Sequence, residues 1–266
     1  MHPMLNTAIR AARTAGDLII RSWERVGDFP VDTKGHHDFV TDVDRAAEQR
    51  IVEILHKAYP DHAILGEEGG SHAEGARYRW IVDPLDGTTN YLQGLPHFAV
   101  SIALEVDGKL EQAVIYDPAK NDLFTASRGS GAQLNERRIR VAERKSLEGT
   151  VLATGFPFKH PDLIEPFLDT LRSFLRHTSG VRRWGAAALD LAYVACGRYD
   201  GYWEHRLNPW DIAAGTLIVR EAGGMVTDFG GGGDFFRTGN ILAASPRVHP
   251  PMLTEIGQRV PADLRR

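Results

Sequence analysis

The chain has 266 residues, of which 42% are apolar and 25% are charged, and its formal net charge is −4. This length suits one large domain, and the composition is that of an ordinary globular enzyme. The mildly acidic balance argues against a protein that mainly neutralises nucleic-acid phosphates. No run approaches the ~20 apolar residues of a membrane span, and the first residues lack the apolar core of a secretion signal. We therefore expect a cytoplasmic protein without a membrane-spanning segment.

Two helices are predicted near the N-terminus. Apolar residues recur on one helical face over residues 5–23, and Pro30 follows the predicted end. A second helix is predicted over residues 42–58 because its apolar residues are spaced by three and four. Thr41 and Asp44 are spaced as a capping box in which Asp takes the place of Glu.

Short strands are predicted next, and the first two lead into acidic residues. Residues 63–65 precede an acidic pair, and residues 80–82 run directly into Asp83. Residues 98–116 are predicted as a hairpin, because the dipeptide at 107–108 is Asp-Gly and lies between two strand-like runs. Further strands are predicted over residues 123–126 and 139–141.

The second half alternates helices and strands. Helices are predicted over residues 163–177, 186–195, 212–222 and 251–260. Strands are predicted over residues 199–203, 225–228 and 241–244. No repeat, low-complexity tract or obvious linker interrupts the chain. The sequence therefore predicts a mixed α and β protein, with residues 1–266 as a single domain of two packed halves, approximately 1–145 and 146–266.

Two carboxylates follow the predicted strand that ends at Asp83. Asp86 comes three residues later, and Pro84 biases Asp83 towards an extended backbone, so a turn here would aim both carboxylates at one point. Gly87 lets a ligand approach the backbone closely. A helix that begins at Thr88 would direct its free N–H groups at the same point. The segment thus predicts an anion site beside a cation site, which a metal-bridged phosphate requires.

Each acidic segment also has an ordinary structural explanation. Asp, Pro and Gly are common in polar turns, which leaves the role of Asp83 and Asp86 open when the turn is taken alone. Glu67 alone would usually be a solvated strand end, and Asp211 alone would usually be a helix N-cap. Three such segments together favour a metal site. The chain has no paired cysteines and no HExxH motif, so Mg²⁺ is favoured over zinc.

Two other features favour structural roles. Cys196, the single cysteine, lies in an apolar stretch, which favours a buried thiol over a reactive one and a reducing compartment over an oxidising one. The glycine run at residues 230–233 favours a flexible turn over a phosphate-binding loop, because no lysine and no helix start follow it.

Three segments together resemble the signature motifs of the inositol monophosphatase family. They are Gly66-Glu67-Glu68, the eight residues from Asp83 to Asn90, and the six residues from Trp210 to Gly215. The resemblance runs along nearly the whole chain, and residues 153–158 and 188–193 are similar to the bacterial SuhB-type branch of the family. It implies an α+β fold built as a five-layered αβαβα sandwich. It also implies two or three Mg²⁺ ions per active site, inhibition by lithium, and a homodimer.

The resemblance also implies roles for individual residues. The implied metal ligands are Glu67, Asp83, Asp86, Asp211 and the backbone carbonyl of Leu85. The residues implied to orient and activate the attacking water are Asp44, Thr88 and Glu67. The implied substrate-binding residues are Gly87 and Thr88, through their amides, with Ala187, Glu204 and Asp211. Lys34 and Glu68 are implied to support the metal site.

The implied reaction is hydrolysis of myo-inositol 1-phosphate to myo-inositol and phosphate by an activated water. Glu204 favours a polyol, because a buried carboxylate would bind ring hydroxyls. Proteins with the same metal core hydrolyse fructose bisphosphate, adenosine bisphosphates or histidinol phosphate, and these substrates stay open as alternatives. Trp184 and Ala186 replace smaller or hydroxylated residues that are common in the family, and this leaves the fine substrate preference open.

A second interpretation concerns a different class of function. The SuhB-type branch also resembles proteins that join transcription antitermination complexes, which would make RNA polymerase a partner. The arginine pairs at residues 137–138 and 182–183 could serve such a partner. An ordinary solvated pair or a dimer edge is the simpler interpretation of both.

Overall fold

The structure is a computed structural model that describes residues 2–23, 31–35, 38–72 and 75–265. Within these ranges, the side chains of residues 31–35, 38–41 and 70–72 are left undescribed.

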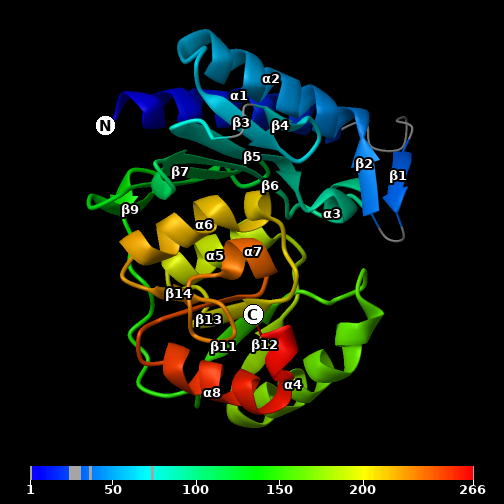
Figure 1. Ribbon diagram of the computed structural model, residues 1–266, viewed down its shortest axis with the longest axis vertical. Coiled ribbons are helices and arrows are strands. Elements are labelled where there is room, and N and C mark those ends of the chain that lie inside the picture. The colour runs from blue at the N-terminus through cyan, green and yellow to red at the C-terminus, as the bar shows by residue number, and fades with distance from the viewer. Residues whose placement is uncertain (1, 24–30, 36–37, 73–74, 266) are drawn as a thin grey trace.

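The chain folds into five layers, in which helices and sheets alternate (Figure 1). The helices are α1 (Pro3–Trp23), α2 (Asp42–Ala58), α3 (Thr88–Leu92), α4 (Ile164–His177), α5 (Ala187–Ala195), α6 (Pro209–Glu221), α7 (Phe235–Thr238) and α8 (His249–Arg259). From top to bottom in Figure 1, α1 and α2 cover a large sheet, α5 and α6 lie beneath it, a second sheet follows, and α4 and α8 close the molecule.

The large sheet has eight strands in the order β10-β9-β8-β7-β6-β5-β3-β4. Its strands are β3 (Ala63–Gly66), β4 (Gly70–His72), β5 (Tyr78–Asp86), β6 (Ala99–Val106), β7 (Lys109–Asp117), β8 (Asp122–Ser127), β9 (Gly131–Leu134) and β10 (Arg137–Arg138). All neighbouring pairs are antiparallel except β3 and β5, which run parallel. That parallel pair places the ends of both strands at one edge of the sheet.

The second sheet has five strands in the order β12-β11-β13-β15-β14. Its strands are β11 (Val151–Thr154), β12 (Gly180–Arg182), β13 (Gly201–Glu204), β14 (Met225–Thr227) and β15 (Ile241–Ala244). Two further strands, β1 (Val31–Gly35) and β2 (Asp38–Thr41), pair only with each other. The chain passes from one sheet to the other between residues 138 and 151, close to the predicted division, and the single-domain assignment stays a prediction.

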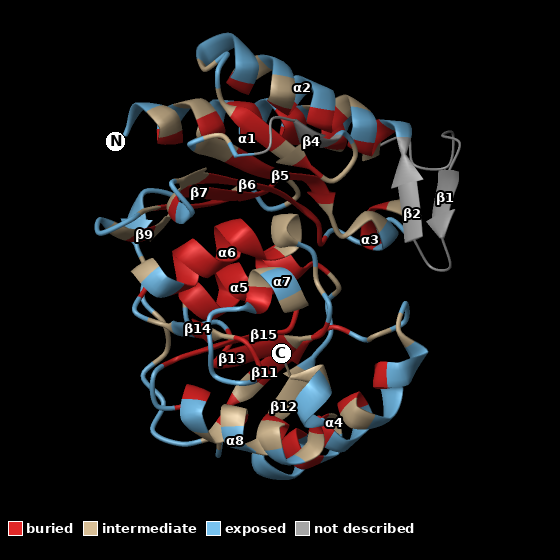
Figure 2. Ribbon diagram, viewed as in Figure 1, coloured by how far each residue is buried: buried red, intermediate tan, exposed pale blue. Residues whose placement is uncertain are grey.

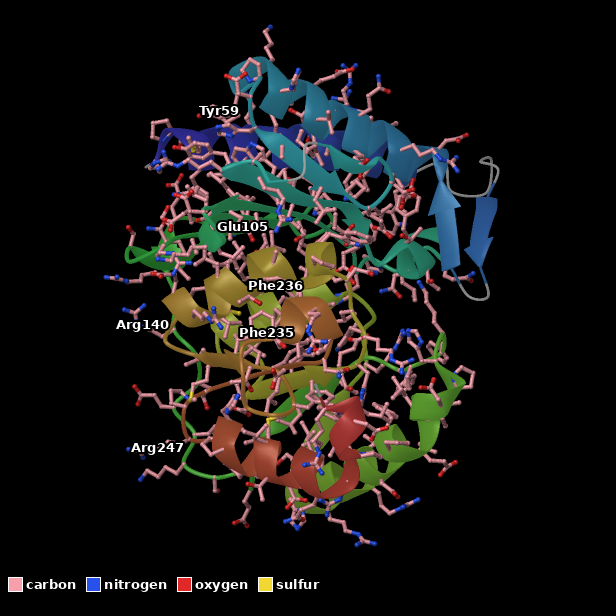
Figure 3. All side chains as sticks on the ribbon, viewed as in Figure 1. Tyr59, Glu105, Arg140, Phe235, Phe236 and Arg247 are labelled. Atoms are coloured by element: carbon pink, nitrogen blue, oxygen red, sulfur yellow. The ribbon has the colours of Figure 1, made fainter. Side chains whose placement is uncertain are left out.

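The middle helices are buried almost completely. Every residue of α5 is buried, and so are eight consecutive residues of α6 (Figure 2). A helix that is apolar on all sides is stable only when protein surrounds it, as the two sheets do here. Figure 3 shows Phe235 and Phe236 of α7 beside these helices, and their rings lie 4.8 Å apart. The middle layer therefore holds the two halves of the chain together through one apolar core.

The outer helices are amphipathic. In α1 the buried positions fall on one face and are mostly Ala and Leu, so the helix lies close to the sheet. In α4 the phenylalanines at positions 167 and 174 face inward and pack against Trp203 of β13. No helix of the described ranges is long and apolar enough to cross a membrane.

The structure confirms most predicted elements, with shifts of a few residues at their ends, and corrects others. The strand predicted over residues 139–141 is wrong. The edge strand β10 stops at Arg138, and the amide of Val141 instead donates to the carbonyl oxygen of Ala222 at the end of α6 (3.2 Å). The short elements that the sequence did not predict are β1, β2, β4, β9, β10, β11, β12 and α7.

Candidate active site

The first two acidic motifs meet because β3 and β5 are parallel neighbours. Gly66 lies opposite Val82 in the register, and the amide of Glu67 donates to the carbonyl oxygen of Val82 (3.2 Å). Glu67 therefore leaves β3 at the level at which β5 reaches Asp83. Asp83 is only 1% exposed, and its Oδ1 accepts a hydrogen bond from the Leu85 amide (3.0 Å).

Asp86 reaches the same region because of an irregularity in β5. The pairing with β6 shifts register between Asp83 and Asp86, so that extra backbone is accommodated on the β5 side. Such a bulge re-aims side chains. Oδ2 of Asp86 accepts a hydrogen bond from the amide of Ala188 at the start of α5 (2.7 Å). The first turn of the buried helix α5 is thereby fixed to the end of β5.

Asp211 arrives from the N-terminus of α6. Its Oδ2 accepts a hydrogen bond from the Asn208 amide (2.6 Å), and the two residues form a reciprocal capping box. The Ser101 hydroxyl of β6 donates to the carbonyl oxygen of Trp210 (3.3 Å), which ties this helix end to the large sheet. The sequence suggested Asp211 as the helix N-cap, which is wrong: the N-cap is Asn208, and Asp211 contributes to the cap from the third helical position. This contribution coexists with a place beside the other carboxylates, because the charge of Asp211 acts on Asp83 and Asp86.

These carboxylates repel one another inside the protein. Burial raises the pKa of Asp83 well above its usual range, and the charges of Glu67 and Asp86 raise the pKa further. Burial likewise raises the pKa of Asp86, followed by the charge of Asp211. The backbone N–H groups of Leu85 and Ala188 lower the pKa of Asp83 and of Asp86, respectively. No described Lys, Arg or His side chain is among the causes that lower either pKa.

The surplus of negative charge among these buried carboxylates shows whether the residues suit a metal ion. Buried charges of one sign are costly unless an opposite charge offsets them. Oxygen ligands with a surplus of negative charge are the set that Mg²⁺ prefers. Within the described ranges, no three His, Cys, Asp or Glu side chains form a tight preformed cluster. Mg²⁺ fits such an open arrangement, because it keeps several waters and needs only one or two carboxylates per ion.

Thr88 and Asp44 also meet, as the sequence analysis expected. The Thr88 hydroxyl lies 3.1 Å from Oδ1 of Asp44 and 3.0 Å from the carbonyl oxygen of Leu85. Asp44 is 1% exposed and belongs to the first turn of α2, 44 positions before Thr88 in the chain. The Thr41 half of the predicted capping box lies outside the described side chains.

Gly87 occupies a position that only glycine fits. Its φ is +91°, and an added Cβ would lie 2.9 Å from the carbonyl oxygen of His97. The helix α3 begins immediately after it at Thr88, with no side chain capping that end. The N–H groups of the first turn therefore point out of the N-terminal end of α3, which is the direction that the sequence analysis predicted for an anion site.

Glu204 lies at the end of β13, and its carboxylate contacts Tyr202 and Gly155. The Tyr202 hydroxyl donates to its Oε2 (2.5 Å), and a Cβ added to Gly155 would lie 1.8 Å from its Oε1. Burial raises the pKa of Glu204 to about 7, and the Tyr202 hydrogen bond opposes this rise. Ala187, the other residue predicted for the polyol pocket, is buried in the first turn of α5.

Two buried carboxylates near this region were not found by sequence reasoning. Glu48 of α2 accepts a hydrogen bond from the Glu68 amide (2.9 Å), and its carboxylate lies where a Cβ on Gly66 would be. It therefore holds the turn that presents Glu67. Asp190 is 1% exposed, and its Oδ1 has no hydrogen-bond partner among the described residues. A lone acid inside the apolar sequence of α5 was the available signal for Asp190.

The remaining predicted residues have plain outcomes. Lys34 falls in β1, where the side chains lie outside the described part of the chain. The amides of Gly230 and Gly232 donate to Oδ1 of Asp228 (2.8 Å each). The glycine run therefore encloses an internal carboxylate, which accounts for it as a turn. The Cys196 thiol is half-buried, and burial raises its pKa, as expected for a structural thiol.

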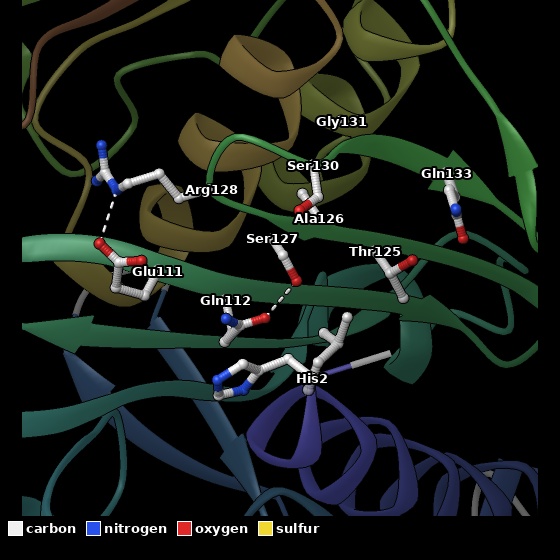
Figure 4. A pocket seen from close by; sticks show the side chains of 11 residues that line it. His2, Glu111, Gln112, Thr125, Ala126, Ser127, Arg128, Ser130, Gly131 and Gln133 are labelled. Atoms are coloured by element: carbon white, nitrogen blue, oxygen red, sulfur yellow. Dashed lines mark hydrogen bonds and ion pairs between the residues drawn. The ribbon is translucent and has the colours of Figure 1, made fainter.

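Two cavities of the described part of the chain lie away from this site. One of about 580 Å³ lies between the start of α1 and the ends of β7, β8 and β9 (Figure 4). There the Ser127 hydroxyl donates to Gln112 (2.5 Å), and Arg128 pairs with Glu111 (2.8 Å). Another of about 400 Å³ lies between α1 and α2. Neither cavity borders the carboxylates, so the candidate site is identified by its acidic residues and not by a cavity.

Comparison with known proteins agrees with the motifs and the fold. The profile described as the inositol monophosphatase family matches residues 1–261. The chain therefore belongs to the inositol monophosphatase family.

Individual relatives cover the whole chain. It is 55% identical to the Nus factor SuhB of Pseudomonas aeruginosa over 271 residues and 51% identical to the Nus factor SuhB of Escherichia coli K12 over 268 residues, with 100% of each chain covered. The crystal structure of the extragenic suppressor protein suhB from Bartonella henselae superposes with a TM-score of 0.94, at 47% identity, over 97% of this chain and 100% of that one. The inositol monophosphatase of Thermotoga maritima superposes with a TM-score of 0.88, at 38% identity, over 96% and 97%. These likenesses confirm the predicted five-layered sandwich.

Replacing Asp83 by Asn is expected to stabilise the metal-free protein at high pH. A carboxyl whose pKa is raised by folding adds stability at low pH, and this contribution is lost as pH rises through the folded pKa. Asn cannot ionise and still accepts the Leu85 hydrogen bond. The gain in unfolding free energy of Asp83→Asn should therefore grow from about pH 5 to about pH 8, by about 1.4 kcal/mol for each pH unit between folded and unfolded pKa values.

Urea denaturation in the presence of a chelator measures this gain. Asp17→Asn, on the exposed side of α1, is the matched control and should show no such pH dependence. Adding Mg²⁺ at about pH 8 should then stabilise the unmodified chain more than Asp83→Asn. If Asp83→Asn gained the same unfolding free energy at about pH 5 as at about pH 8, the inferred repulsion between the carboxylates would be wrong.

Proposed function

We propose that this protein is a Mg²⁺-dependent phosphatase that hydrolyses a small phosphate monoester, with inositol monophosphate as the first candidate substrate. The carrying observation is the meeting of Glu67, Asp83 and Asp86 at adjacent strand ends, where burial and the neighbouring negative charges raise the pKa of both aspartates. Membership of the inositol monophosphatase family supports the phosphatase class.

The metal ligands in this proposal are Glu67, Asp83, Asp86, Asp211 and the carbonyl oxygen of Leu85. Bound Mg²⁺ would lower the pKa of a water and neutralise charge on the phosphate. The protein's own part is to hold these oxygens in place before the ion arrives. It does so through the Leu85 and Ala188 amides and through Glu48, which fixes the turn before Glu68.

Thr88 and Asp44 would orient the attacking water in this proposal. A hydroxyl that donates to Asp44 has a lone pair left to accept a hydrogen bond from water. Asp44 can then receive the water's proton through Thr88 as the water oxygen attacks phosphorus and the ester P–O bond breaks. The amides of Gly87 and Thr88 would hold the phosphate oxygens, and the departing alkoxide takes a proton from solvent.

The organic part of the substrate would face Glu204 and Ala187. A carboxylate held by Tyr202 and buried beside Gly155 is a fixed acceptor for hydroxyl groups. Its pKa of about 7 leaves it partly ionised at neutral pH. This supports a polyol, while fructose bisphosphate, adenosine bisphosphates and histidinol phosphate stay open as alternatives.

Phosphate release from myo-inositol 1-phosphate is expected only when Mg²⁺ is present. Asp83→Asn should lower kcat/KM by at least about a hundredfold, because a charged ligand of the ion is removed while the side chain keeps its shape. Inorganic phosphate release, with and without a chelator, measures both effects. Near-normal turnover by Asp83→Asn at saturating Mg²⁺ would contradict the proposed ligand set.

Thr88→Ala is expected to lower kcat by roughly 10²- to 10⁴-fold, the usual range for a group that aids proton transfer. Thr88→Ser keeps the hydroxyl and should retain most of the activity. KM should change little in either variant, because the backbone amide at this position stays. Equal loss in Ala and Ser variants would point to packing rather than to the hydroxyl.

A second candidate function is association with the transcription machinery, as an antitermination factor that binds RNA polymerase. It rests on relatives at 51% and 55% identity that carry the name Nus factor SuhB. We expect the purified chain to retain RNA polymerase or its elongation factors from an extract of its own cells. Asp83→Asn should bind equally well, because this role would not require phosphate hydrolysis. Absence of these proteins in a sensitive pull-down would count against this function.

A further inference from the structure

Polar side chains gather on the face of the large sheet that packs against α1. Gln112 of β7 lies opposite Ser127 of β8, and Thr125 of β8 lies opposite Gln133 of β9. Residues opposite each other, and residues two positions apart in a strand, lie on the same face of a sheet. The four side chains therefore form one polar surface across three strands, and they line the cavity of about 580 Å³ (Figure 4).

This polar surface interrupts an apolar one. Val114 and Leu123 lie on the same face, two positions along their strands, and they belong to the apolar core beneath α1. Gln112 and Thr125 are each only 5% exposed, so they are nearly as buried as that core. Burying a polar side chain is unfavourable unless it finds a hydrogen-bond partner. Amides and hydroxyls therefore occupy buried positions at which apolar residues would pack better.

The buried polar groups keep hydrogen-bonding capacity that the protein does not use. Oε1 of Gln112 accepts a hydrogen bond from the Ser127 hydroxyl (2.5 Å). Within the described ranges, the amide nitrogen of Gln112 and the hydroxyl of Thr125 make no hydrogen bond. Both side chains line the cavity, so these donors are open to a molecule bound there.

The wall of the cavity is held in place, and its carboxylate and guanidinium charges cancel. Arg128 pairs with Glu111 (2.8 Å), as Figure 4 shows. The turn between β8 and β9 is fixed from α6, because the two carboxylate oxygens of Glu221 accept hydrogen bonds from the amides of Gly129 and Gly131 (2.8 Å each). The donors and acceptors of the cavity therefore stand on a rigid frame.

We propose that this cavity is a second binding site, separate from the carboxylates, for a small uncharged polyhydroxylated molecule such as a monosaccharide or a polyol. Hydroxyl groups both donate and accept, which matches the mixed amides and hydroxyls of Gln112, Thr125 and Gln133. An anion would meet the Glu111 carboxylate, and an apolar molecule would leave the buried polar groups unpaired. The volume of about 580 Å³ suits a small molecule. The site is independent of the proposed phosphatase function, because the two share no residue.

We expect at least one of D-glucose, sorbitol and myo-inositol to shift the side-chain amide NMR signals of Gln112 and Gln133 on the full chain. The shifts should saturate with a Kd of roughly 1 mM, which a few neutral hydrogen bonds can supply. Thr125→Val and Gln112→Leu keep the approximate size of the side chain, and each should raise Kd at least about fivefold. Gln49→Leu, on the exposed side of α2, is the matched control and should leave Kd unchanged.

Three results would overturn the inference. The first is the absence of a saturable shift with all three molecules, or a Kd that neither Thr125→Val nor Gln112→Leu changes. The second is a saturable shift of the same signals by inorganic phosphate alone, which would make the site an anion site. The third is a set of shifts confined to the backbone amides of Gly87 and Thr88, which would place binding at the carboxylates. Each readout is binding and not turnover, so the phosphatase proposal stands or falls separately.

Discussion

The central constraint on this structure is the repulsion between buried carboxylates at one edge of the large sheet. Asp83 is almost completely buried, Asp86 is fixed by the first turn of α5, and the charge of Asp211 reaches both from the start of α6. Backbone amides lower the pKa of Asp83 and of Asp86, which burial and the neighbouring negative charges raise. A protein keeps such an arrangement when an ion from outside completes it, because burying uncompensated charge otherwise lowers stability. We therefore expect a bound cation to stabilise the folded chain.

Much of the structure serves to hold that edge rigid. The parallel pair β3 and β5 sets Glu67 level with Asp83, and Glu48 of α2 fixes the following turn. Every residue of α5 is buried, which fixes the Ala188 amide that binds Asp86. Carboxylates supported in this way need little rearrangement when charge develops beside them, and such preorganisation is a main way in which a protein scaffold contributes to catalysis.

Local sequence patterns predicted what depends on short-range physics. Helical periodicity located α2 and α6, and the Asp-Gly turn located the β6–β7 hairpin. The edge strands were missed because β10 and β12 have two and three residues, too few to show alternation. The meeting of Asp44 with Thr88 came from the family resemblance, since tertiary packing alone brings residues 44 positions apart together. Glu48 was missed because its partner is a backbone amide, which no sequence pattern records.

The buried carboxylates and the exposed turn at Arg183 differ in how freely their residues can be replaced. The carboxylates lie at buried strand ends and at a helix start, so replacing one changes the balance of charge inside the protein. Arg183 stands on exposed aromatic rings and on the turn at Gly185, outside the buried core. Substitutions there are expected to cost little stability, because the side chain is exposed. Trp184, half exposed beside Arg183, lies in the same exposed turn and is expected to tolerate replacement in the same way.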